Sequence, residues 1–86
     1  MCRSIKPLFN FEPPATEAEI RAAAVQFVRK VSGFQRPSRD NAALFDETVG
    51  DITRSLLTLI GGLHTKASPR DREIEAAKAR ARYATS

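Results

Sequence analysis

Cys2 and His64 are the side chains of this 86-residue chain best suited to nucleophilic or metal chemistry, as its single thiol and single imidazole. A Cys–His catalytic pair needs both groups within hydrogen-bond reach and a third group that orients the histidine. His64 instead follows Gly61-Gly62, far along the chain from Cys2, with no evident orienting partner. Because structural zinc usually takes four Cys or His ligands, two are too few. We therefore expect no enzyme, no metal and no cofactor.

Cys2 has one further use to weigh. The nearby cations Arg3 and Lys6 favour the thiolate form, which makes Cys2 a candidate reactive thiol or a partner in an intermolecular disulfide. The alternative is a small terminal residue, buried or frayed, with no chemical role. A single cysteine also excludes an internal disulfide and fits a reducing compartment.

A second candidate site is basic. No acid occurs between positions 29 and 39, which hold four cations: Arg29, Lys30, Arg36 and Arg39. Ser38 and the amides that begin the next helix add hydrogen-bond donors at the positive end of a helix dipole. These five residues could hold a phosphate, a carboxylate or a nucleic-acid backbone. The alternative is a solvated face, and the next helix carries acids that would repel phosphates: Asp46, Glu47 and Asp51.

The helix that must position this cluster has the clearest pattern in the chain. Its apolar residues recur at steps of three and four and so share one face: Phe45, Val49, Ile52, Leu56, Leu59 and Leu63. With Ser38 as its cap, this helix is predicted over about 39–61. Leu44 and Leu57 fall on its flanks, where we expect the N-terminal segment or another helix to cover them.

Two further helices flank it. Thr16 and Glu19 form a capping box, apolar residues recur at helical spacing to Val31, and Gly33 provides an exit, which predicts a helix over 17–32. Ser68 as cap and Pro69 at the first helical position predict another over 69–83. That last helix should be well held near Ile74 and looser beyond it.

The N-terminal residues 1–15 should form an extended arm. Pro7, Pro13 and Pro14 oppose a helix, yet four large apolar side chains need cover: Ile5, Leu8, Phe9 and Phe11. No stretch is typical of a strand. We therefore predict one all-α domain over 1–86, with the arm packed on a three-helix core (16–83) and a frayed end (84–86).

Composition narrows the setting. Residues 1–36 and 66–86 are each basic, the middle is mildly acidic, and the net charge is +4. Basic termini either fold over the acidic helix or present a surface to phosphate-rich partners. Apolar runs are too short to span a bilayer, and residues 1–7 lack the apolar core of a signal peptide. We expect a cytoplasmic protein with no membrane association.

Several stretches resemble a small bacterial family called domain of unknown function 2277. Its opening is similar to Met-Cys-Arg-x-Ile-Lys-x-Leu-Phe-Asn-Phe-x-Pro-Pro-Ala-Thr at 1–16, and its first helix to residues 20–24 and 27–34. Further similarity covers Pro37-Ser38, Asn41 and Phe45, then 69–73 and 75–82, while 48–66 share a pattern alone. The resemblance implies a bacterial, intracellular, single-domain protein and brings no activity.

The function expected from these observations is that of a small, non-catalytic binding or interaction module. Its partner would be another protein, or a second copy if the apolar stripe pairs between chains as in a coiled coil. The alternative is nucleic-acid or anion binding through Arg29, Lys30, Arg36, Ser38 and Arg39.

Overall fold

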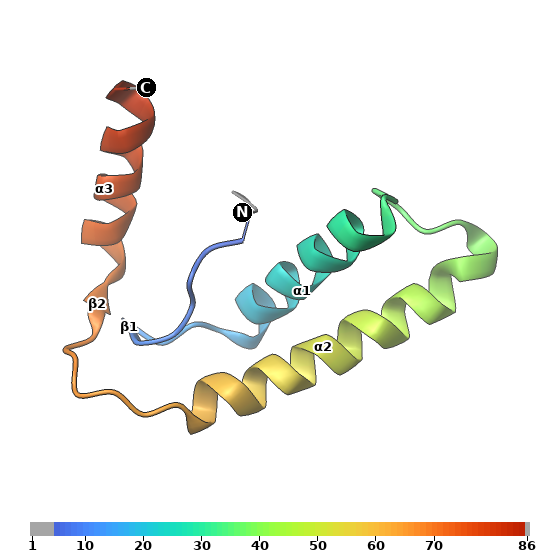
Figure 1. Cartoon of the computed structure of the whole chain (residues 1–86), viewed down its shortest axis with the longest axis horizontal. Helices are drawn as coiled ribbons and strands as arrows, with labels where there is room; N and C mark the ends of the chain where they lie inside the picture. The colour runs from blue at the N-terminus through green and yellow to red at the C-terminus, as the bar shows by residue number, and fades with distance from the viewer. Residues whose placement is uncertain (1–4, 86) are drawn as a thin grey trace.

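A helical hairpin and a separate helix lie on either side of the N-terminal arm (Figure 1). The computed structural model describes residues 5–85, and the side chains of residues 5–82. In chain order the elements are β1 (Phe11–Glu12), α1 (Glu17–Ser32), the short 3-10 helix η1 (Arg39–Asn41), α2 (Ala42–Gly62), β2 (Arg70–Asp71) and α3 (Arg72–Thr85). The molecule measures 44 × 35 × 18 Å. It is a small, mostly α-helical domain, as the sequence predicts.

The core lies between the antiparallel helices α1 and α2. Its buried apolar residues come from both helices: Ile20, Ala24, Val28 and Val49. The buried hydroxyl of Thr53 donates a hydrogen bond of 2.7 Å to the Val49 carbonyl, so its polar atom has a partner. Half-buried side chains widen this core: Val25, Phe45, Ile52 and Leu56. The first four members of the predicted α2 stripe therefore face α1.

The far end of that stripe departs from the prediction. Leu59 is 52% exposed and Leu63 is 44% exposed. On the flanks, Leu44 and Leu57 are exposed as well. The expectation that the N-terminal segment or another helix would cover Leu44 and Leu57 is wrong, because α3 leaves β2 alongside the arm and does not fold back over α2 (Figure 1).

Helix α1 matches its predicted bounds because its end signals are local. The Glu19 amide donates to the Thr16 hydroxyl at 3.2 Å, and the Thr16 amide donates to the Glu19 carboxylate at 3.0 Å. At the other end Gly33 adopts a left-handed conformation (φ 79°) and its amide donates to the Arg29 carbonyl. This geometry suits glycine, which has no Cβ to clash.

A two-residue parallel strand pair was missed from the sequence. Phe11 pairs with Arg70 and Glu12 with Asp71. Asn10, the residue before β1, also takes part, because its carbonyl accepts a 2.7 Å hydrogen bond from the Arg70 amide. The pairing holds residues 70–71 extended, so α3 begins at Arg72 and not at the predicted position 69.

The cap of α3 is consequently Asp71, not Ser68. The Asp71 carboxylate accepts a 3.0 Å hydrogen bond from the Ile74 amide, as an N-cap residue does. Ile74 itself is 56% exposed, so the start of α3 is held by the polar contacts of Asp71 and Arg72 and not by burial of Ile74.

The arm itself is extended through its described part, as predicted. Its apolar side chains are partly buried: Ile5, Leu8, Phe9 and Phe11.

Candidate functional site

The predicted basic cluster surrounds the turn of the α1–α2 hairpin, at the end of the molecule far from α3 (Figure 1). Arg29 and Lys30 lie in the last turn of α1, and Arg39 begins η1. Arg29 is half-buried, whereas the other four members are exposed: Lys30, Arg36, Ser38 and Arg39. Consecutive residues on a helix point about 100° apart, so Arg29 and Lys30 diverge. The cluster is therefore spread around the hairpin turn.

Ser38 does not cap the next helix as expected. Its side chain makes no capping hydrogen bond to the backbone, and its Oγ accepts from the Asn41 side chain at 2.9 Å. Arg29 gives a different signal, because its Nε is buried with no hydrogen-bond partner among the described residues. Such an atom is costly to leave unsatisfied, but its burial also keeps it from contact with an anion in solvent.

An apolar groove of about 390 Å³ opens on the same end of the hairpin. We call it the hairpin groove, and its lining is mainly apolar: Phe27, Val28, Val31, Ser32, Phe34, Pro37, Asn41, Leu44, Phe45, Thr48 and Ile52. Phe27 is 50% exposed, Val31 72% and Leu44 65%. Val31 ends the apolar spacing predicted for α1, yet it lies with Phe27 on the open flank of the hairpin. Two features of the sequence could have indicated this exposed apolar surface: the wide apolar face of α1, and Leu44 outside the apolar stripe of α2.

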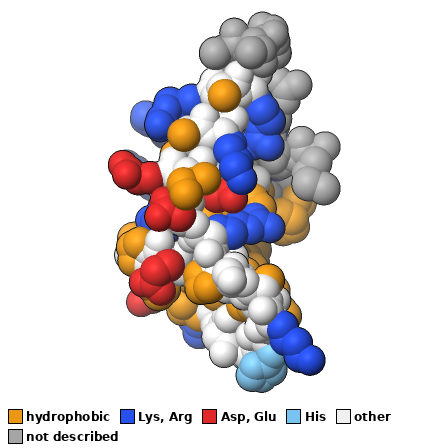
Figure 2. All heavy atoms as spheres, turned by 90° about the vertical axis from the view of Figure 1, so that its left-hand side faces the viewer, with side chains coloured by type: hydrophobic (Ala, Val, Ile, Leu, Met, Phe, Trp, Pro, Cys, Tyr) orange, Lys and Arg blue, Asp and Glu red, His pale blue; other side chains and the backbone are white. Residues whose placement is uncertain are grey.

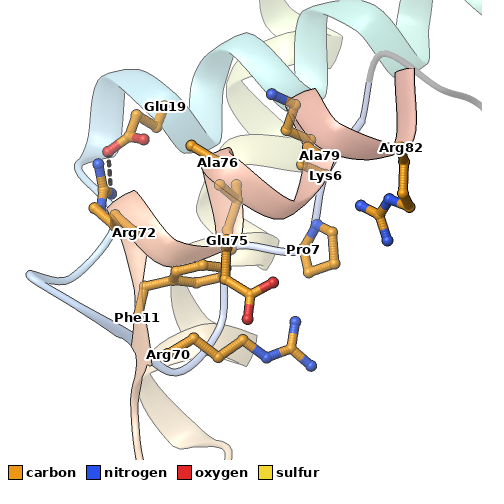
Figure 3. A pocket seen from close by; sticks show the side chains of 11 residues that line it. Lys6, Pro7, Phe11, Glu19, Arg70, Arg72, Glu75, Ala76, Ala79 and Arg82 are labelled. Carbon is orange, nitrogen blue, oxygen red and sulfur yellow. Dashed lines mark hydrogen bonds and ion pairs between the residues drawn. The ribbon is translucent and has the colours of Figure 1, made fainter. Parts of the chain in front are cut away.

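A second groove, of about 500 Å³, lies at the other end, between the arm and α3 (Figure 3). We call it the arm groove. The residues lining it come from the arm, α1, β2 and α3: Lys6, Pro7, Leu8, Phe11, Glu19, Arg70, Arg72, Glu75, Ala76, Ala79 and Arg82. No part of this groove was predicted, because residues so far apart in sequence show no shared pattern.

Arg72 holds the arm against the start of α3. Its Nε donates to the Pro13 carbonyl at 2.9 Å. Its Nη2 donates to the Glu19 carboxylate at 2.6 Å and to the Pro14 carbonyl at 3.4 Å. A planar guanidinium can make several such bonds at once, and an ammonium cannot match that geometry. Arg72 thus joins α3 to both the arm and α1.

The electrostatics of Glu19 follow from this contact. The hydrogen bond from Arg72, followed by that from the Thr16 backbone, lowers the pKa of Glu19 from 4.5 to about 2. Both donors favour the charged carboxylate over the neutral acid. Glu19 is therefore an anion at neutral pH, paired with Arg72 and unsuited to proton transfer there.

Asn10 makes a second connection between the arm and the segment before α3. Its side-chain amide donates to the Ser68 carbonyl at 3.1 Å and to the Ala67 carbonyl at 3.5 Å. Its backbone is left-handed (φ 65°), a conformation that asparagine tolerates better than most residues. Asn10 therefore contributes through both its side chain and its backbone turn.

The single imidazole, that of His64, lines neither groove. His64 is exposed, and Figure 2 shows it in pale blue at the bottom of the molecule. Cys2 lies outside the described residues. Within residues 5–85, three or more His, Cys, Asp and Glu side chains nowhere gather as metal ligands would. Nor does any helix in that range have the length and apolar character to cross a membrane.

Comparison with known proteins gives one match. A family model described as "Uncharacterized conserved protein (DUF2277)" matches residues 1–78. No curated protein and no solved structure matches the chain.

Proposed function

The chain belongs to the family of uncharacterized conserved proteins DUF2277, whose description names no reaction, and we propose that it is a non-catalytic protein-binding module. The observation that carries this proposal is the hairpin groove, with Phe27, Val31 and Leu44 each at least half exposed along it. An apolar surface of this kind is a frequent mark of a protein-binding site. Complete burial of a large apolar side chain gains about 1.5–3 kcal/mol, and covering the exposed part of each of these three would gain a share of that, so docking there is favourable.

The occupant that fits best is an amphipathic helix of a partner protein. The groove runs between two helices, and helical partners commonly bind such grooves through apolar side chains spaced three and four residues apart. The basic cluster adds a preference of charge. Lys30 and Arg36 are next to groove residues in the sequence, and no acid lies between positions 29 and 39. Acidic side chains beside the partner's apolar face would complement this end of the groove.

Site-specific photo-cross-linking tests the proposal. A benzoylphenylalanine at position 34, used in extract from the source cells, should cross-link one discrete partner through an acidic, amphipathic segment. Leu44→Glu should remove this cross-link, because it places a charge within the groove. The matched control is Thr58→Glu, on the exposed surface of α2 away from the groove, which should leave it intact.

Three outcomes would overturn the proposal. Equal cross-linking in Leu44→Glu and Thr58→Glu would show that the groove is not involved. Absence of any discrete cross-link would remove the partner. Cross-linking to a second copy of the chain, with a dimeric mass by light scattering, would replace a partner helix by self-association.

The proposed setting is the bacterial cytoplasm. The single cysteine of the chain supports it, since a reducing compartment is where unpaired thiols are usual. Immunodetection in fractionated cells tests this, and recovery with the envelope or the medium would contradict it.

Anion or nucleic-acid binding at the hairpin turn is the second candidate function. The four exposed members of the basic cluster favour it: Lys30, Arg36, Ser38 and Arg39. Binding to duplex or single-stranded DNA should then weaken steeply between low and moderate salt, because neutralised phosphates release counterions. It should weaken again in Arg29→Ala with Arg36→Ala and not in Arg80→Ala on α3. Salt-independent binding, or none, would end this candidate.

A further inference from the structure

We propose that the arm groove binds an amphiphilic anion, meaning a phosphate or carboxylate group carried on a small apolar body. This site is separate from the hairpin groove, at the opposite end of the molecule. It therefore does not depend on the proposed protein partner.

The apolar part of such a ligand would meet the arm and α3. Leu8 and Phe11 come from the arm, and Ala76 and Ala79 are one turn apart on α3. The alanine methyl groups leave room that larger side chains would fill. Leu8 and Phe11 are already half-buried, so a ligand covering their remaining surface would release water from apolar area.

The charged part would meet cations that the fold leaves unpaired. Among the described residues, neither Lys6 nor Arg70 takes part in an ion pair, although both line the groove. The Arg70 guanidinium lies over the Phe11 ring, 5.8 Å from its centroid. At this distance the guanidinium is within range of a cation–π attraction to the ring, which draws Arg70 toward the apolar side of the groove.

Two acidic side chains also line the groove, and both are already engaged. Glu19 is bound by Arg72. Glu75 lies 3.7 Å from Lys78 on the same helix. Because Lys6 and Arg70 have no such ion pair among the described residues, they leave the groove with positive charge that its own acids do not balance. The charged ends of Arg70, Glu75 and Arg82 point toward the same open side (Figure 3). Anionic ligands are thus favoured, and Glu75 can accept a hydrogen bond from a ligand hydroxyl.

The walls of the groove are fixed before any ligand arrives. The β1–β2 pair sets Phe11 against Arg70, and Arg72 fastens α3 to the arm through two proline carbonyls. A site whose walls are already held together loses less entropy on binding.

The test is an NMR titration of the full chain, ¹⁵N-labelled, at low salt. The probes are phenyl phosphate, benzoate, inorganic phosphate and phenol, which together separate the anionic head from the apolar body. We expect phenyl phosphate or benzoate to shift the amides of Phe11, Arg70, Ala76 and Ala79 in a saturable way. The ratio of their affinities identifies which head is preferred. Inorganic phosphate and phenol should each bind at least about fivefold more weakly, since each lacks one half of the recognition.

Paired variants decide whether the groove is responsible. Arg70→Gln should weaken binding of the better probe by about five- to tenfold. Arg80→Gln removes the same charge from an exposed position on α3 outside the groove and should change it by less than about twofold. If Arg70→Gln alters the circular dichroism spectrum, Lys6→Gln replaces it, with the same expected loss. Equal weakening by the groove and control variants, or no saturable shift with either amphiphilic probe, would overturn the proposal.

Discussion

The two ends of this molecule are held together by different kinds of interaction. Between α1 and α2, apolar side chains pack against one another across a short connection, with Ala24 and Val49 almost fully buried. At the arm–α3 junction, residues more than 50 positions apart are joined mainly by polar contacts, from Asn10 and Arg72 to backbone carbonyls. The hairpin is therefore held by a hydrophobic core, whereas the junction is held by directional hydrogen bonds and an ion pair.

This difference shows how a chain of 86 residues can hold a third helix in place without packing it into the hydrophobic core. Polar contacts to the arm take the place of apolar packing. Hydrogen bonds near the surface stabilise less than buried apolar groups, because water competes for the same partners. We therefore expect the hairpin to set the global stability and the junction to open locally at lower free energy. The predictions below test this division, from the largest expected effect to the smallest.

Removing core volume from the hairpin should have the largest effect. Ile20 is 2% exposed, and Ile20→Ala should lower the free energy of unfolding by about 3 kcal/mol through lost burial and the cavity left behind. Urea denaturation followed by circular dichroism measures this. Val31→Ala on the same helix, at a side chain 72% exposed, is the control and should cost less than about 0.5 kcal/mol. Similar losses in both variants would contradict a core that includes Ile20.

Removing the guanidinium of Arg72 should loosen the junction and spare the hairpin. Arg72→Gln loses the contacts to Pro13, Pro14 and Glu19. Hydrogen exchange of the Arg70 amide, which is bonded to Asn10, should then become about tenfold faster. Amides in the middle of α2 should change by less than about twofold. Equal acceleration in both regions would show that the two ends unfold as one unit.

Substitutions at Asn10 separate its backbone role from its side-chain role. Asn10→Ala loses the side-chain bonds to residues 67 and 68 and also places a Cβ in a left-handed conformation. It should speed exchange of the Arg70 amide by about fivefold. Asn10→Gly loses the same bonds but relieves the backbone, so about twofold is expected. A larger effect for glycine than for alanine would contradict the left-handed turn.

Acid should weaken the junction over a pH range that is set by the titration of Glu19. Its pKa is about 2 in the fold and 4.5 as the ordinary value, so ionised Glu19 favours the folded state. This contribution is complete above pH about 4.5, declines as the pH falls and is lost below about 2. The stability difference between the natural chain and Glu19→Gln should therefore shrink across that range. In Arg72→Gln, carbon NMR should show the Glu19 pKa raised toward 4.5. A pKa of Glu19 that stays unchanged would exclude Arg72 as the main cause.

Local sequence signals predicted the hairpin well. The bounds of α1 follow from Thr16, Glu19 and Gly33, all within a few residues of the ends they determine. Helix α2 was predicted over 39–61 and is observed as η1 followed by Ala42–Gly62. Apolar spacing also identified Phe45, Val49, Ile52 and Leu56 as the inward face. Such signals suffice because each interaction spans only a few residues.

The junction could not be predicted in the same way. A strand of two residues has no alternation to detect, and Phe11 meets Arg70 only after the hairpin between them has formed. Ser68-Pro69 is a valid helix start by local criteria, but the pairing of residues 70–71 displaces it, and Asp71 takes over as cap.

The candidate sites divide along the same line. The basic cluster comes from one short stretch, residues 29–39, and its role as a site stays a prediction. The arm groove combines the arm with β2 and α3 and was missed.

The parallel pairing of β1 with β2 also bears on how this protein can be engineered. Because the two strands lie side by side, residues 13–69 leave and return at the same place, with the turn between α1 and α2 at the outer tip (Figure 1). Gln35 is exposed at that tip. A reporter domain inserted there should be tolerated, since insertions succeed at exposed loops that carry few contacts. The arm and α3 would then remain joined, and the inserted reporter domain would project from the opposite end of the molecule.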